Sequence, residues 1–496
     1  MSDRWLDVER VFSGVRWLAI GQVVGLIARF AVSVALAHLL APEDFGLLTM
    51  AGVFTALGGL FSSLGVGPAI VQRPEVSIPL LRSLATVGFV VGAGLSGALV
   101  LGSGFIAEFY GDTRVAPIAA SLAMTFVVAS LGMVPEGLLQ RELRFNRLVS
   151  IDLAVLAVSA SLSVGLALAG LRVWALVVAN LGGTAVRSLL LVASSPWRLA
   201  PGFDWGAIRG VVGFSASVMG FNGTQYLQRN SDRLIIGRAL GAIELGYYDY
   251  AYQFYMYPLE SVTVVLIKVM FPTFSRIKGD IEQLGRAFLR ANGAIALITF
   301  PMTVGLAVVA DPFVRFVFGE KWAPVITLVQ ILAPVGLVQS IGATPGQLFL
   351  ARGRAALRFW WSVIYTTIFV AAFFAGIPWG ILGMASAYAI VTIPINIAGF
   401  WLALRLVNLD LADLWRTLRR TTAATAGMGA GVAVLRLALE ASGVRGVVVL
   451  SICIPVGMLI YAAMTRALRP EALQDLFRLL SPRIQRSRPA NWLMLP

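Results

Sequence analysis

Arg29 and Arg229 are the residues whose type and position most directly suggest chemistry. Each lies near the middle of a long apolar stretch, and they stand 200 residues apart. An arginine in the hydrocarbon core of a membrane costs roughly 3 kcal/mol or more, so it usually marks a function or a buried partner. Two arginines at matching places of a repeat suggest a site on a pseudo-symmetry axis.

The repeat extends beyond these arginines. An ungapped shift of 200 residues aligns Leu40–Gly46 with Leu240–Gly246. The same shift matches three further pairs: Gln22 with Asn222, Ala51 with Ala251, and Phe54 with Phe254. We therefore expect the two halves of the chain to fold alike.

Polar residues near Arg229 follow steps of three and four, which places them on one helical face. We expect the substrate-binding residues of a cationic cavity among Gln22, Arg29, Asn222, Gln225, Arg229 and Arg233. Guanidinium groups form bidentate pairs with phosphate, so an anionic substrate fits them. The alternative for the second arginine is a structural salt bridge between Arg229 and Asp232. Arg29 has no acidic neighbour in its own helix, which favours a binding role for it.

Three carboxylates are candidates for ion coupling or for salt bridges: Asp232, Asp249 and Glu260. The sequence otherwise lacks an enzyme constellation, and we expect no catalytic residue, cofactor or metal. The single His38 lies at the end of an apolar stretch and cannot complete a Ser/His/Asp set. The single Cys453 excludes an intrachain disulfide and a thiol metal site, and no Walker A motif is present.

The composition predicts an all-α polytopic membrane protein. Of 496 residues, 58% are hydrophobic and only 13% are charged, and apolar runs of about 20 residues recur throughout. Because no strand-like alternation supports a barrel, the runs indicate helices. We place 14 spans at residues 15–40, 45–70, 84–106, 115–134, 148–170, 173–193, 211–240, 245–271, 291–310, 322–350, 357–376, 380–404, 421–439 and 444–465.

The charge distribution predicts the orientation of the chain. The net charge is +14, and most Lys and Arg residues fall in the segments that are cytoplasmic if the N-terminus is inside. Both termini are then cytoplasmic. Basic clusters in these segments are most simply anchors on anionic membrane lipid, so we exclude a nucleic-acid partner.

The shift of 200 residues carries span 1 onto span 7, which predicts two six-helix lobes related as a parallel repeat. We expect an amphipathic N-terminal segment (1–14), an N-lobe (15–193), a linker (194–210), a C-lobe (211–404), a second linker (405–420), two appended helices (421–465) and a basic tail (466–496). We find no cleavable signal peptide.

Four segments resemble a known family: AHLLAPEDFGLLTMA at residues 37–51, LGVGPAIVQ at 64–72, NSDRLIIG at 230–237 and LGYY at 245–248. They are similar to Wzx-type polysaccharide flippases of the colanic-acid-exporter-like branch. These belong to the multidrug/oligosaccharidyl-lipid/polysaccharide (MOP) exporter superfamily. The resemblance covers roughly residues 10–410, and Pro42–Gly46 is expected to shape the turn between the first two spans.

The resemblance implies alternating access and transfer of undecaprenyl-diphosphate-linked oligosaccharide across the bacterial inner membrane. Partners would be this lipid-linked substrate and the polymerase and glycosyltransferases of the same pathway. A drug/cation antiporter of the same superfamily is the alternative, although cationic drugs favour acidic cavities. A glycosyltransferase or glycan polymerase is less favoured, because the predicted external loops are too short for a catalytic domain. A membrane scaffold would leave the matched arginines unexplained.

Overall fold

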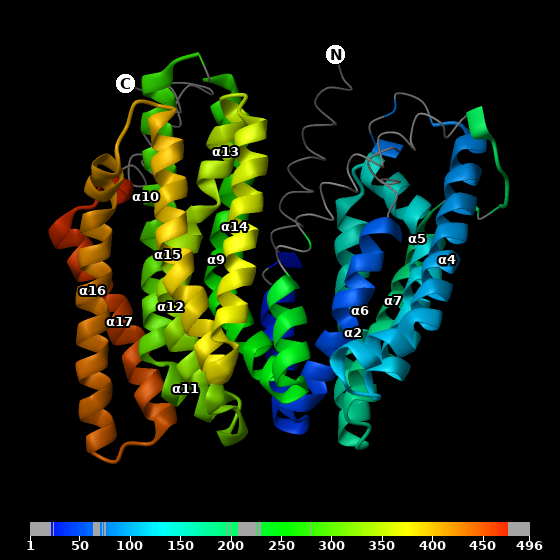
Figure 1. The fold of residues 1–496 in the computed structure, drawn as a ribbon, viewed down its shortest axis with the longest axis horizontal. Coiled ribbons are helices and arrows are strands. Elements are labelled where there is room, and N and C mark those ends of the chain that lie inside the picture. The colour runs from blue at the N-terminus through cyan, green and yellow to red at the C-terminus, as the bar shows by residue number, and fades with distance from the viewer. Residues whose placement is uncertain are drawn as a thin grey trace. The chain divides into compact units, whose positions relative to one another are not determined.

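The computed structural model describes residues 21–22, 24–62, 70–71, 73, 76–195, 197–198, 200–206, 226, 230–277 and 279–474. Within these ranges the regular structure is helical, and no β-strand occurs (Figure 1). The chain divides into two compact units, Met1–Tyr247 and Tyr248–Pro496. The predicted amphipathic segment 1–14 lies outside the described residues, as does most of the basic tail.

Unit 1 is a helical bundle whose first described apolar helix, Val24–Leu39, is shorter than the others. Its labelled helices are α2 (Pro42–Ser62), α4 (Ile78–Tyr110), α5 (Val115–Arg141), α6 (Phe145–Leu168) and α7 (Val173–Ser194). Helix α5 packs against α2, α4 and α7, and α6 packs against α7 (Figure 1). Gly92 on α4 permits this packing, because a Cβ there would lie 2.7 Å from the carbonyl oxygen of Phe126 on α5.

Helix α9 (Ala242–Arg276) begins in unit 1 and continues into unit 2. The remaining helices of unit 2 are α10 (Ile281–Val308), α11 (Ala310–Val317), α12 (Pro324–Gly342), α13 (Thr344–Ala351), α14 (Ala355–Gly376), α15 (Gly380–Arg405), α16 (Leu411–Ala441) and α17 (Gly446–Leu468). Two short 3-10 turns, η1 (Glu320–Trp322) and η2 (Ile377–Trp379), connect helices. A hydrophobic core that includes Phe288, Leu348 and Phe400 holds α10, α13 and α15 together.

Ten segments within the described residues are long and apolar enough to cross a membrane, so the chain is a multi-span membrane protein. One of them, Ala355–Arg405, contains both α14 and α15. The predicted spans from 84–106 to 173–193 and from 245–271 to 444–465 each fall on described helices, whereas 15–40, 45–70 and 211–240 lie partly outside the described residues. Helices such as α4 extend beyond the predicted apolar span because a helix does not have to end where the hydrocarbon ends.

The appended helices α16 and α17 pack together, and α16 also packs along α10 (Figure 1). Val309, Val432 and Val449 belong to the apolar cluster that joins them. The Tyr461 hydroxyl on α17 donates a hydrogen bond to the Leu297 carbonyl on α10, at 2.7 Å. The pair is therefore part of unit 2.

Candidate functional site

Arg29 lies on the exposed surface of the first described helix, with Gln22 two turns before it. Its Nη2 is 3.7 Å from the position that a Cβ would take on the buried Gly25, so the guanidinium folds back over this glycine. Arg29 makes no hydrogen bond or ion pair with another residue that the structure describes. Its neighbours Val24 and Ile27 are also exposed, at 46% and 64%. No acceptor among the described residues therefore takes up the donors of this guanidinium.

The predicted partners of Arg29 in the second half are only partly visible. Asn222, Gln225 and Arg229 lie outside the described residues. Arg233 is held within its own helix, because its Nη1 donates a hydrogen bond to the Asn230 side-chain oxygen at 3.0 Å. Asp232 is 2% exposed and accepts the backbone N–H of Arg233 at 2.8 Å. The structure thus brings together Asp232 and Arg233, while the expected pairing of Arg229 with Asp232 stays a prediction.

The two other candidate carboxylates lie on α9. Asp249 accepts a hydrogen bond from the Gln253 amide at 3.2 Å and is only partly buried. The backbone of Glu260 is helical, and its side chain lies outside the described residues. Tyr255 on the same helix is 1% exposed, and its hydroxyl donates to the Gln339 oxygen at 3.0 Å. Tyr255 therefore belongs to the packed interior of unit 2.

The repeated motif forms a close crossing of α2 and the start of α9, entirely within unit 1. A Cβ on Gly46 would lie 1.8 Å from the Ala242 carbonyl oxygen, and a Cβ on Gly246 would lie 2.0 Å from the Pro42 carbonyl oxygen. Residues 42 and 242 are themselves a pair in the repeat. The expected turn at Pro42–Gly46 is displaced, because α2 already begins at Pro42. Proline suits the first position of a helix, where its missing N–H costs nothing.

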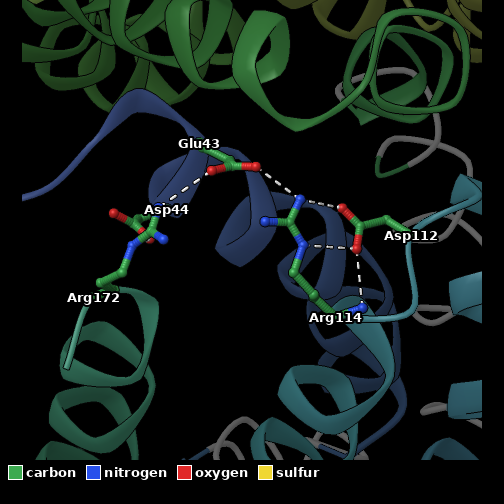
Figure 2. A network of polar contacts seen from close by, with 5 residues as sticks. All are labelled: Glu43, Asp44, Asp112, Arg114 and Arg172. Atoms are coloured by element: carbon green, nitrogen blue, oxygen red, sulfur yellow. Dashed lines mark hydrogen bonds and ion pairs between the residues drawn. The ribbon is translucent and has the colours of Figure 1, made fainter.

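Beside this crossing, three carboxylates and two arginines form an ionic network (Figure 2). Arg114 Nη2 lies 2.7 Å from Glu43 Oε1 and 2.8 Å from Asp112 Oδ2. The hydrogen bonds from Arg114 lower the pKa of the Asp112 carboxyl below its ordinary value. The network thus ties the loop between α4 and α5 to the first turn of α2.

Arg172 supplies the second cation, from the residue before α7. Its Nη2 lies 3.3 Å from Glu43 Oε2, and its Nε lies 3.4 Å from Asp44 Oδ1 (Figure 2). Asp44 also accepts the backbone N–H of Ala41 at 2.9 Å, which satisfies one donor at the start of α2. A cavity of about 460 Å³ lies beside the network, with Arg114, Arg172 and Trp174 among its lining residues.

Further arginines lie inside predicted spans, and the repeat gave no indication of two of them that form ion pairs, Arg187 and Arg436. Arg187 on α7 pairs with Glu136 on α5 at 3.0 Å and also with Asp152 on α6. Arg436 on α16 has its Nε 3.7 Å from Glu440 Oε1. An arginine inside an apolar run was the available signal for both. In the part of the chain that the structure describes, no cluster of His, Cys, Asp and Glu has a metal-binding arrangement.

Comparison with known proteins identifies the family. The model of the polysaccharide biosynthesis protein family matches residues 35–327. The lipopolysaccharide biosynthesis protein WzxC of Escherichia coli (strain K12) is 30% identical over 404 residues, which cover 80% of this chain and 81% of WzxC. The teichuronic acid biosynthesis protein TuaB of Bacillus subtilis (strain 168) is 28% identical over 477 residues, or 95% of this chain and 98% of TuaB.

Among solved structures, the lipid II flippase MurJ in an inward closed conformation is similar to the chain, with a TM-score of 0.72. The match covers 92% of this chain and 99% of MurJ at 14% identity, so it establishes the fold alone. The all-helical prediction and the resemblance to polysaccharide flippases are both confirmed. The chain belongs to the polysaccharide biosynthesis protein family and is a Wzx-type relative of WzxC.

Proposed function

We propose that the protein is a flippase that moves undecaprenyl-diphosphate-linked oligosaccharide across the bacterial inner membrane for polysaccharide biosynthesis. The observation that carries this proposal is the exposed guanidinium of Arg29, which has no ionic partner among the described residues. Membership of the polysaccharide biosynthesis protein family supports the pathway. WzxC and TuaB, named for lipopolysaccharide biosynthesis and teichuronic acid biosynthesis, support it further.

A diphosphate suits this arginine chemically. It carries negative charge on several oxygens, and a guanidinium can bind two of them at once through parallel N–H donors. In the apolar surroundings of Val24 and Ile27, such a pair is stronger than it would be in water. Arg229 holds the matching place in the repeat, so we assign it the same role. Gln22, Asn222, Gln225 and Arg233 complete the polar set that we propose for the substrate.

We propose alternating access through a cationic cavity as the mechanism, in a chain of 14 spans with two six-helix lobes and both termini in the cytoplasm. In this mechanism the protein provides no catalytic group and breaks no bond in the substrate. Asp232, Asp249 and Glu260 remain the candidates for coupling transport to an ion gradient.

The test is complementation of a flippase-null strain with Arg29→Ala and Arg29→Lys, with glycan export measured at matched protein levels in the membrane. Alanine should reduce export at least about tenfold, since a charge-assisted pair contributes roughly 1.5–3 kcal/mol. Lysine should restore part of the export, because it keeps the charge and loses the bidentate geometry. Arg445→Ala, at an exposed residue outside the repeat, is the matched control and should export normally. Normal export by Arg29→Ala would overturn the role of this arginine.

The drug/cation antiporter is the second candidate, and the exposed guanidinium of Arg29, which has no ionic partner among the described residues, disfavours it because cationic drugs favour acidic cavities. The same strains distinguish the two functions. An antiporter would change resistance to cationic drugs without restoring glycan export.

A further inference from the structure

A cavity of about 370 Å³ lies within unit 2, between α10, α12 and α16. Most of its wall is apolar, and two lining side chains, Gln330 and Arg436, are polar. The apolar lining consists of Val304, Ala307, Val308, Ala333, Pro334, Leu337 and Ala433. All three helices belong to segments that are long and apolar enough to cross a membrane.

The cavity begins near one side of the membrane and extends inward. Its lining residues on α10 and α16 lie near the C-terminal ends of those helices, Val308 and Ala441. Helix α12 begins on the same side, at Pro324, and lines the cavity from Gln330 to Leu337. This stretch of helix is roughly 10 Å long. In the predicted orientation this is the outer side.

Arg436 is an unusual residue for such a wall. Its side chain is only 19% exposed, and its buried Nε has no hydrogen-bond partner among the described residues. The Glu440 oxygen lies 3.7 Å from this nitrogen, which is beyond hydrogen-bond distance. A largely buried cation with one distant counter-charge gains free energy from a closer anion, because the surrounding protein screens charge weakly.

We propose that this cavity binds an anionic phospholipid, with its phosphate on Arg436 and part of one acyl chain along the apolar wall. The observations make two demands on the occupant. The arginine requires an anion near the membrane interface, and the apolar lining requires a hydrocarbon chain. A free phosphate satisfies only the first demand. A depth of roughly 10 Å accommodates a segment of an acyl chain, whereas a polyprenyl chain would extend far beyond it.

The bound lipid would fill space between α16 and the helices α10 and α12. Ala433 lies one turn before Arg436, so both face the cavity from α16. The lipid would thereby help to hold the appended pair α16–α17 on unit 2. This role is independent of the substrate that the protein transports.

Native mass spectrometry of the full-length, delipidated protein tests the proposal, with phosphatidylglycerol, phosphatidylcholine and undecaprenyl phosphate as probes. Phosphatidylglycerol should bind at one high-affinity site, and Arg436→Gln should weaken it about tenfold, as loss of a charge-assisted pair implies. Ala433→Phe keeps the arginine and fills the cavity, so it should also weaken binding. Ala433→Phe therefore tests the proposal even if Arg436→Gln does not fold.

Two matched controls accompany these variants. Arg445→Gln makes the same charge change at an exposed residue, and Val434→Phe adds the same ring at a side chain that is 68% exposed. Both should bind phosphatidylglycerol as the wild type does. Unchanged binding in Arg436→Gln and Ala433→Phe overturns the proposal. A site that depends on Arg436 but takes undecaprenyl phosphate and not phosphatidylglycerol also overturns it.

Discussion

Gly46 and Gly246 hold the same position in the two halves of the repeat, and each lies against the backbone of the other's helix. The carbonyl oxygen that blocks a Cβ on Gly46 belongs to Ala242, and the one that blocks Gly246 belongs to Pro42. The contact is therefore reciprocal, as a two-fold relation between α2 and the start of α9 requires. Without side chains at these two positions, the helix backbones can approach closely.

Gly46→Ala and Gly246→Ala should each destabilise the protein, because a methyl group would overlap a backbone oxygen. We expect about 1–3 kcal/mol for each, as for overpacked core sites, measured by thermal unfolding in detergent. The double variant should lose less than the sum, since a single separation of the helices relieves both overlaps.

Gly52→Ala is the matched control on the same helix. Nothing lies within 4 Å of a Cβ at Gly52, so alanine should stabilise α2 by about 0.5–1 kcal/mol. Equal destabilisation by Gly52→Ala and Gly46→Ala would contradict the close crossing of α2 and the start of α9.

Gly25 should control the conformation of Arg29. The guanidinium lies at ordinary contact distance, 3.7 Å, from a Cβ built at Gly25, so Gly25→Ala should export glycan nearly as well as the wild type. Gly25→Val carries two further methyl groups and should displace the guanidinium, reducing export in the same complementation assay. Equal export by the two variants would show that this conformation does not matter for function.

Asp112 should make a pH-dependent contribution to stability. Arg114 lowers the pKa of the folded carboxyl, so this contribution is present above the unfolded pKa, about 3.9, and is lost as pH falls through the folded pKa. At pH 7 Asp112→Asn should be slightly less stable than the wild type, by about 1 kcal/mol or less.

The measurement is the thermal unfolding midpoint of both proteins from pH 7 down to pH 3. The difference between them should shrink as the medium becomes more acidic. Arg114→Gln removes the cause of the shift and should show the same reduced dependence on pH. If the midpoints of the wild type and Asp112→Asn differed by the same amount from pH 7 to pH 3, the lowered pKa of Asp112 would not contribute to stability.

Arg172 combines an ionic role with an uncommon backbone conformation, φ 49° and ψ −130°. Arg172→Ala removes the ion pairs with Glu43 and Asp44 and keeps the strain. Arg172→Gly removes the same pairs but relieves the strain, so it should be more stable than the alanine variant by about 1 kcal/mol. The comparison requires only the two unfolding midpoints, and a less stable glycine variant would contradict it.

Much of the architecture could be predicted from the sequence, because a chain in a bilayer must satisfy its backbone hydrogen bonds internally. The predicted span 173–193 lies within Val173–Ser194, and 357–376 lies within Ala355–Gly376. The repeat at Leu40–Gly46 also indicated that Gly46 and Gly246 are equivalent. The alignment could not show that they meet, because sequence spacing does not specify which helix faces pack together.

The charged contacts could not be predicted from the sequence for the same reason. Glu43 and Arg172 are separated by 129 residues and interact only because α2 and α7 pack in one unit. Arg29 and Arg436 are both arginines in apolar helices, and the sequence distinguishes them only by the repeat. Composition and periodicity alone determined that this protein is a helical membrane protein with internally repeated chemistry. Three-dimensional packing decided which of the described charges are paired with one another, because distant helices must meet before their side chains can neutralise one another.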